Sequence, residues 1–121
     1  MSATSNAVEV GKVVYAFEGD LGATVWLLRY DTKENNKALI QIMFVDNELN
    51  GKIILAEVDE TQKHKHYVIQ LNNKPHSLLI QDKNKIELFL PGEQSNLDLV
   101  YNKNLSRAGN PQAFLAEYES Q

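Results

Sequence analysis

The chain has 121 residues, no cysteine and a formal net charge of −4, with 43% hydrophobic and 23% charged residues. This length suits one domain with its own hydrophobic core, and the composition is that of a folded globular protein. The lack of cysteine excludes disulfides and thiolate metal sites. The acidic balance argues against nucleic acid as a partner, and no apolar run is long enough to cross a membrane.

Residues 1–7, MSATSNA, are small and polar, which predicts a flexible tail. They lack the basic and apolar regions of a secretory signal. A small, polar start is also what remains after a signal has been removed. The compartment therefore stays open: cytoplasmic for the sequence as written, or exported if a signal once preceded it.

Alternating apolar and polar residues predict about eight strands between residues 8 and 101. The first segment, 8–17, changes phase at Gly11, which is typical of a β-bulge. The later strands are expected at 25–30, 38–45, 53–58, 67–71, 76–81, 85–90 and 97–101. Consecutive strands joined as hairpins predict an antiparallel up-and-down meander, either a closed barrel or a curled sheet, with a two-sheet sandwich as the alternative.

Two tight turns set the register within 67–90. A two-residue turn at 73–74 would require a backbone N–H from Pro75, which proline lacks. A four-residue loop at 72–75 avoids this and pairs Leu71 with His76, which keeps the large apolar side chains on one face.

The next turn is expected to be a three-residue loop at 82–84, with Asn84 in the left-handed conformation that Asn tolerates. Earlier in the chain, a loop at 47–51 would place Ile54 opposite Phe44. These registers are expectations that a structure tests directly.

The end of the chain changes character. Asn110 as a cap and Pro111 at the first helical position predict a helix at 110–120, whose apolar stripe contains Phe114, Leu115 and Tyr118. This helix is expected to pack on the sheet or to plug one end of a barrel. No repeat or linker divides the chain, so residues 1–121 are interpreted as one domain.

One segment matches the spacing of a calcium-binding loop. Asp46, Glu48, Asn50 and Gly51 are followed five residues later by Glu57, and alternate oxygen ligands of this kind can converge on one ion. Such loops require flanking helices, whereas both flanks here read as strands. A hairpin turn at Asn50 and Gly51 explains the same residues.

His64 and His66 are a second metal candidate, because on a strand they share one face. The predicted register places His76 on the opposite face, so the third ligand is missing. Lys63 and Lys65 add positive charge that disfavours a cation. A solvated strand edge explains this segment equally well, and no metal or other cofactor is predicted.

No catalytic residue is predicted. Ser77, Ser95 and Ser106 lack a nucleophile elbow. The glycines at 19–22 lack the lysine and helix of a phosphate loop, and the carboxylates at 59–60 lie in a polar turn where general acid catalysis is not expected.

Four aromatic residues remain as candidates for binding: Tyr15, Phe17, Trp26 and Tyr30. They can line a barrel interior or form an outer patch for a partner, and the ordinary interpretation is that they belong to the core. On the strand at 25–30, Trp26 and Tyr30 share one face, and Val25, Leu27 and Arg29 share the other.

The leading hypothesis is a small non-enzymatic binding module whose partner is another protein, as in an inhibitor, immunity or accessory factor. The alternative is a carrier of an apolar small molecule inside a barrel. A carrier requires a cavity of about 300 Å³ or more, and an interior filled by Trp26, Phe44 and Phe89 would exclude it. A protein-binding module requires an exposed apolar patch.

Overall fold

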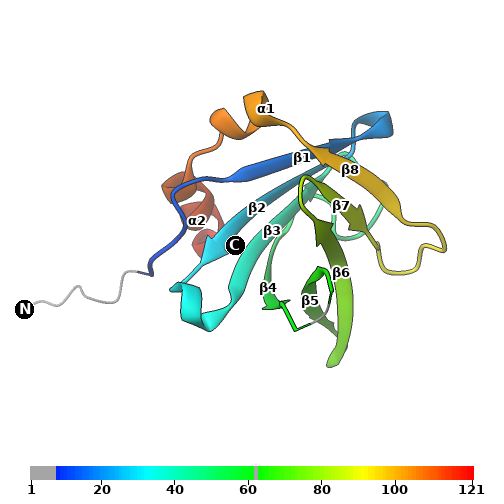
Figure 1. Ribbon diagram of the computed structural model, residues 1–121, viewed down its shortest axis with the longest axis horizontal. Coiled ribbons are helices and arrows are strands. Elements are labelled where there is room, and N and C mark those ends of the chain that lie inside the picture. Colours follow the sequence, from blue (N-terminus) through cyan, green and yellow to red (C-terminus); the bar gives the residue numbers. More distant parts are fainter. Residues whose placement is uncertain (1–7, 62) are drawn as a thin grey trace, which may run out of the picture.

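The computed structural model describes residues 8–61 and 63–121. The predicted flexible tail, residues 1–7, lies outside the described residues. Eight antiparallel strands follow one another around a closed barrel, and the last pairs with the first (Figure 1). The strands are β1 (Tyr15–Gly19), β2 (Thr24–Tyr30), β3 (Lys37–Met43), β4 (Ile53–Asp59), β5 (Lys65–Leu71), β6 (Lys74–Asp82), β7 (Lys85–Leu88) and β8 (Leu97–Tyr101). The predicted up-and-down meander is confirmed in its closed form, and the sandwich alternative is wrong.

Two helices follow the barrel: α1 (Lys103–Arg107) and α2 (Pro111–Ser120). The predicted cap is confirmed, because the Asn110 side chain accepts a hydrogen bond of 3.0 Å from the backbone N–H of Ala113. The short helix α1 was not predicted. No helix in the described part of the chain is both long and apolar enough to cross a membrane.

Most of the barrel interior is filled by the inward-facing residue of each alternating pair, as the pleat requires, and Leu78 joins Leu79 where the register of β5 and β6 shifts. Its buried members are Phe17, Ala23, Val25, Leu27, Ala38, Ile40, Ile42, Leu49, Ala56, Tyr67, Ile69, Leu78, Leu79, Ile86, Leu88, Leu90 and Leu99. Leu49 and Leu90 come from the loops after β3 and β7, so apolar side chains close that end of the barrel. We call it the closed end.

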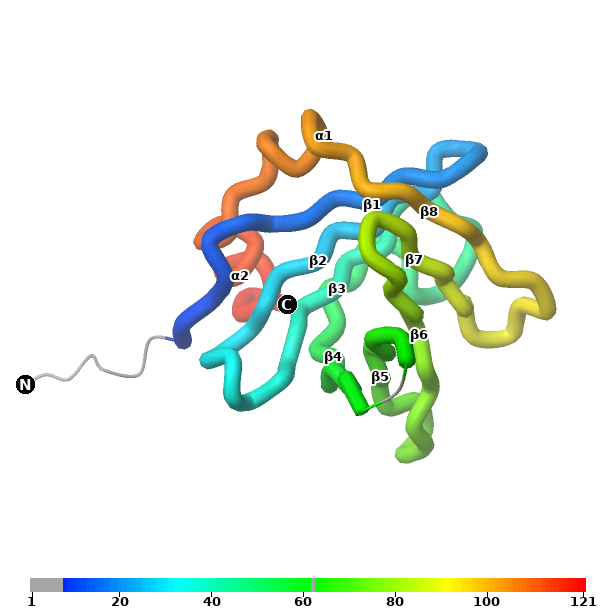
Figure 2. The backbone as a smooth tube through the Cα atoms, in the orientation of Figure 1, coloured from blue at the N-terminus to red at the C-terminus, as the bar shows by residue number. Residues whose placement is uncertain are grey.

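A second apolar cluster lies outside the barrel wall. Phe114 and Leu115 of α2 pack with Leu28, Leu39 and Ile53 on the outer faces of β2, β3 and β4. Figure 2 shows the C-terminal segment running beside these strands. The predicted helix therefore packs on the sheet and does not plug the barrel.

The N-terminal segment contributes to this outer layer without being a continuous strand. Val10 forms an isolated bridge with Tyr30, and the backbone N–H of Gly11 donates to the Arg29 carbonyl at 2.9 Å. Regular pairing begins only at Tyr15. The expected strand at 8–17 is therefore too long, although Gly11 does mark an irregular position.

The hairpin between β5 and β6 turns on Asn72 and Asn73, whose φ angles of 52° and 65° are both left-handed. Two left-handed central residues characterise the type I′ turn that matches hairpin twist, and Asn tolerates this conformation. The predicted loop at 72–75 is wrong, because Leu71 pairs with Lys74.

The objection raised by Pro75 does not apply to this turn. Pro75 lies opposite Gln70, next to the closing pair of the hairpin, at a position where antiparallel partners exchange no hydrogen bond. The missing N–H therefore costs nothing. His76 consequently pairs with Ile69 and not with Leu71.

The turn between β6 and β7 also differs from the prediction. Asp82 pairs with Lys85, so the loop has two residues, and Lys83 instead of Asn84 takes the left-handed conformation, with φ 58°. A register shift between Tyr67 and Val68 lies upstream in β5. Such bulges are not visible in an alternating pattern.

The register of β3 and β4 is shifted by an even number of residues. Ile54 pairs with Ile40 and not with Phe44, because the loop spans 44–52. Because the shift is even, Ile40, Ile54 and Ala56 keep their predicted face, whereas Phe44 lies in the loop and is exposed.

The barrel closes where β1 meets β8, and α1 extends this seam. The backbone N–H of Ala16 donates to Ser106 Oγ at 2.8 Å, and the Ala16 carbonyl accepts from Asn102 at 2.8 Å. Ser106 is buried and its hydroxyl donates to the Asn102 carbonyl. One serine side chain thus satisfies a buried backbone donor at the seam.

Replacing Ser106 by Ala is expected to lower the free energy of unfolding by roughly 1–3 kcal/mol, because the buried Ala16 N–H loses its acceptor. The measurement is urea unfolding followed by circular dichroism. Ser120→Ala is the matched control, since that exposed hydroxyl also donates to a helical carbonyl but accepts no buried N–H. We expect less than about 0.5 kcal/mol for it, and equal losses in both variants would contradict the seam assignment.

Candidate functional site

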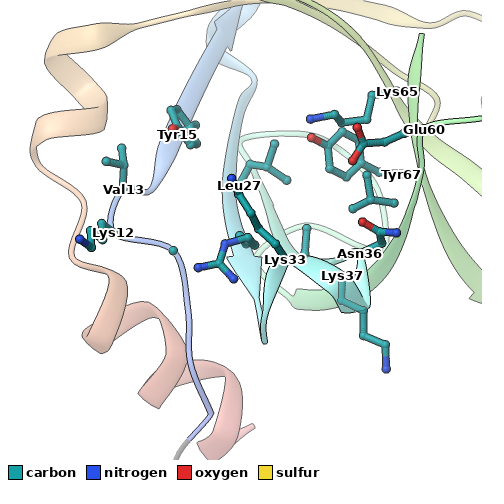
Figure 3. Close-up of a pocket in the computed structure, with 14 residues that line it drawn as sticks. Lys12, Val13, Tyr15, Leu27, Lys33, Asn36, Lys37, Glu60, Lys65 and Tyr67 are labelled. Atoms are coloured by element: carbon teal, nitrogen blue, oxygen red, sulfur yellow. The ribbon is translucent and has the colours of Figure 1, made fainter. Parts of the chain in front are cut away.

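A pocket of about 620 Å³ occupies the end of the barrel opposite the closed end (Figure 3). Its walls come from the start of β1, the end of β2, the start of β3, the end of β4 and the start of β5. The lining residues are Gly11, Lys12, Val13, Tyr15, Leu27, Arg29, Lys33, Asn36, Lys37, Ala38, Val58, Glu60, Lys65 and Tyr67. We call this end the barrel mouth.

A small inward-facing side chain on β3 leaves space for the pocket at the mouth. Ala38 lines the pocket, whereas Ile40 and Ile42, deeper on the same strand, are completely buried in the filled interior. Leu27 and Val58 form the wall on the neighbouring strands. The floor and wall are therefore apolar, and the edge carries the polar groups.

Tyr67 lines the pocket with its ring and directs its hydroxyl to a fixed partner. The hydroxyl donates to Gln81 Oε1 at 2.6 Å. Burial, followed by the charge of Glu60, raises the pKa of Tyr67 above its ordinary value of 10.0. The phenol is therefore neutral at physiological pH and acts as a hydrogen-bonding group, not as a charge.

The outer edge of the pocket is strongly basic. Its charged side chains are the cations Lys12, Arg29, Lys33, Lys37 and Lys65 and the single carboxylate Glu60. Figure 3 shows Lys65 and Glu60 at the same edge as Tyr67, with Lys12 on the far side of the pocket. Lys37 extends away from the pocket in the same view.

The structure separates the four aromatic candidates. Phe17 is in the barrel interior with 2% of its surface exposed. Trp26 and Tyr30 lie on the outer wall, as their predicted shared face required, and pack into the cluster beneath α2. The Tyr30 ring contacts that of Tyr118, with centroids 5.8 Å apart.

Tyr15 is the only one of the four among the residues that line the pocket. It is 46% exposed, and its ring lies 6.1 Å from that of Tyr101. It is therefore available to a ligand at the mouth.

The residues with calcium-loop spacing do not converge. Asp46 and Glu48 are exposed in the loop at the closed end, and the Asn50 side chain accepts the backbone N–H of Val45 at 3.0 Å. Glu57 lies far along β4, paired with Lys37 near the mouth. The hairpin interpretation accounts for Asn50.

The histidines also remain apart. His66 is on the outer face, where its Nδ1 lies 3.0 Å from Ser77 Oγ, and His64 faces Asp82 at 4.0 Å. His76 is hydrogen-bonded to the Phe89 carbonyl. Within residues 8–61 and 63–121 no group of three or more possible metal ligands is found.

Sequence reasoning did not identify Arg29, Lys65 or Tyr67 as pocket residues. The signal was nevertheless present, because Arg29 alternates in phase with Leu27, and Lys65 alternates in phase with Tyr67. A charged residue at the end of an inward-facing series marks the mouth of a barrel. The segment around Lys65 was interpreted only as a solvated edge.

Comparison of the chain with protein families, curated proteins and solved structures gave no match.

Proposed function

We propose that this protein is a non-enzymatic carrier that holds a small molecule with an apolar body in the barrel mouth. The observation that supports this is the pocket of about 620 Å³ with its apolar wall. Its size falls within the range of small-molecule sites, roughly 300–1,000 Å³. The large aromatics that would have excluded a carrier do not fill it, because Trp26 is on the outer wall, Phe44 is 70% exposed and Phe89 is not among the lining residues.

The barrel supplies what such a site needs. Its wall is held by continuous strand pairing, so the pocket exists before a ligand arrives and little conformational freedom is lost on binding. Apolar surface on Leu27, Val58 and Tyr67 provides the favourable term when water leaves.

Filling the pocket is expected to abolish binding. In Val58→Trp the indole occupies the mouth, so the affinity for N-phenyl-1-naphthylamine, a neutral apolar fluorophore, falls at least about tenfold as the buried contact area is lost. The measurement is the saturable rise in probe emission on titration.

Val100→Trp is the matched control, because Val100 is 53% exposed on β8 and does not line the pocket. It makes the same substitution on the outside of the barrel and is expected to bind like the wild type. Failure of the wild type to bind the probe saturably, or equal affinities in the two variants, would contradict the carrier proposal.

A specific observation also supports the protein-binding hypothesis, at the closed end. Leu21 is 99% exposed and Phe44 is 70% exposed, and both have positive φ angles, of 66° and 63°. Bulky residues rarely adopt this conformation, and such strain often accompanies function. The two loops flank the same strand pair, since Thr24 pairs with Met43.

A protein partner at this end would require the exposed side chains and not the barrel mouth. Leu21→Gly is expected to raise the free energy of unfolding by about 1 kcal/mol, because glycine adopts positive φ without strain.

The double variant Leu21→Gly, Phe44→Ser should lose any partner captured by cross-linking to the wild type, whereas Val100→Ser should retain it. Capture that survives the double variant contradicts this second candidate.

A further inference from the structure

Positive charge is concentrated at the barrel mouth of an acidic protein. The pocket edge holds five of the twelve Lys and Arg residues of the chain and one of its sixteen carboxylate residues. A smaller hollow of about 260 Å³ between α1 and the segment before β1 shares Lys12 and Val13 with the mouth and adds Lys103 and Arg107, and no carboxylate lines it. The charged side chains that line these two hollows are therefore mainly cationic, although the chain as a whole carries −4.

Two of these cations belong to inward-facing positions. Arg29 follows Val25 and Leu27 on the inner face of β2, and Lys65 precedes Tyr67 on the inner face of β5. A cation at such a position lies above the apolar wall. A residue one position earlier or later on the same strand would instead point to the outer face, where water surrounds a charged side chain freely.

Arg29 is fixed in place by its neighbours. Its guanidinium donates to the Asp31 carbonyl, and its Nη2 lies 3.9 Å from Glu9 Oε1. The second contact partly balances its charge. Arg29 therefore contributes a positioned donor to the edge more than a free charge.

Lys65 is different. In the described part of the chain the two ion pairs are Arg29 with Glu9 and His64 with Asp82, so no carboxylate there lies within 4.0 Å of the Lys65 ammonium. No hydrogen bond of its side chain is found in the same residues either. Figure 3 shows the amine at the edge of the pocket, on the Tyr67 side.

We propose that the ligand of this pocket is an amphipathic anion, whose apolar body lies against Leu27, Val58 and Tyr67 and whose acidic head group pairs with Lys65. This inference rests on the proposed carrier function and specifies the chemical class of its cargo. The head group stays at the edge, where water remains, so its desolvation cost is small while the ammonium still attracts it. Arg29 and Lys33 also line the pocket and add positive charge around its opening.

The test uses three ligands with the same ten-carbon chain and different head groups: decanoate, 1-decanol and decylammonium. Each displaces N-phenyl-1-naphthylamine from the wild-type protein, and the displacement curve gives its affinity. We expect decanoate to bind about tenfold more tightly than decanol, because its carboxylate forms one partly solvated ion pair with Lys65 and the neutral alcohol does not. Decylammonium should bind most weakly, because its positive head group is repelled by the same lysine. Raising the ionic strength should reduce this preference.

Lys65→Met keeps the length of the side chain and removes its charge. It should weaken decanoate binding about tenfold and leave decanol binding within twofold, because only the ion pair is lost. Lys74→Met is the matched control, since this exposed lysine lies at the closed end and makes the same change in net charge. Lys33→Met is the second variant if Lys65→Met does not fold, and it should reduce the same preference.

The outcomes separate the two proposals. If none of the three ligands displaces the probe and the probe itself does not bind, the carrier function fails. If decanol and decylammonium bind as tightly as decanoate, or if Lys65→Met weakens all three equally, the pocket stands and the anionic head group is wrong. A wild-type preference for decanoate that only Lys65→Met and Lys33→Met remove supports the inference.

Discussion

Pairing of β1 with β8 is the constraint on which the rest of the molecule depends. Phe17, Glu18 and Gly19 pair with Tyr101, Val100 and Leu99, and this short seam joins the two ends of the meander. A Cβ at Gly19 would lie 2.7 Å from the Asp98 carbonyl oxygen, so only glycine permits the approach. Without the seam, both terminal strands would present unpaired edges and the interior would be open along its side.

Closure makes the two ends of the barrel the only routes to its interior, and they are built differently. At the closed end, Leu49 and Leu90 fold in from their loops and complete the apolar core. At the mouth, Ala38 leaves space and charged side chains surround the opening. The asymmetry follows from which loops carry apolar residues, and it leaves the pocket of about 620 Å³ at the mouth of an otherwise packed barrel.

The outer cluster beneath α2 makes this arrangement rigid from outside. Ile53 exchanges two hydrogen bonds with the side chain of Gln121, at 2.8 and 2.9 Å, which fastens the end of the chain to β4. Trp26 and Tyr30 are used here, in packing between wall and helix. Aromatic residues that looked like binding candidates therefore support the wall of the pocket from behind.

Alternation of residue type predicted the meander and the faces of its strands, because the period of two depends only on the backbone. The turns were harder, since a left-handed pair such as Asn72 and Asn73 competes with longer loops that use the same residues. The shift between Tyr67 and Val68 leaves no trace in the pattern. At the site, the inward position of Lys65 was readable from its phase with Tyr67. Trp26 is partly buried by packing against a cluster that contains Phe114 and Leu115 of α2, and local patterns cannot reveal a contact so distant in the sequence.

The central claim is that a ligand enters at the mouth and nowhere else. Amide ¹H–¹⁵N NMR spectra of the full chain, recorded during titration with decanoate, test it most directly. We expect saturable shifts confined to the mouth, with those of the Ala38, Lys65 and Tyr67 amides among the largest. Shifts centred on the closed end, around Leu49 and Leu90, or no saturable shifts at all, would contradict it.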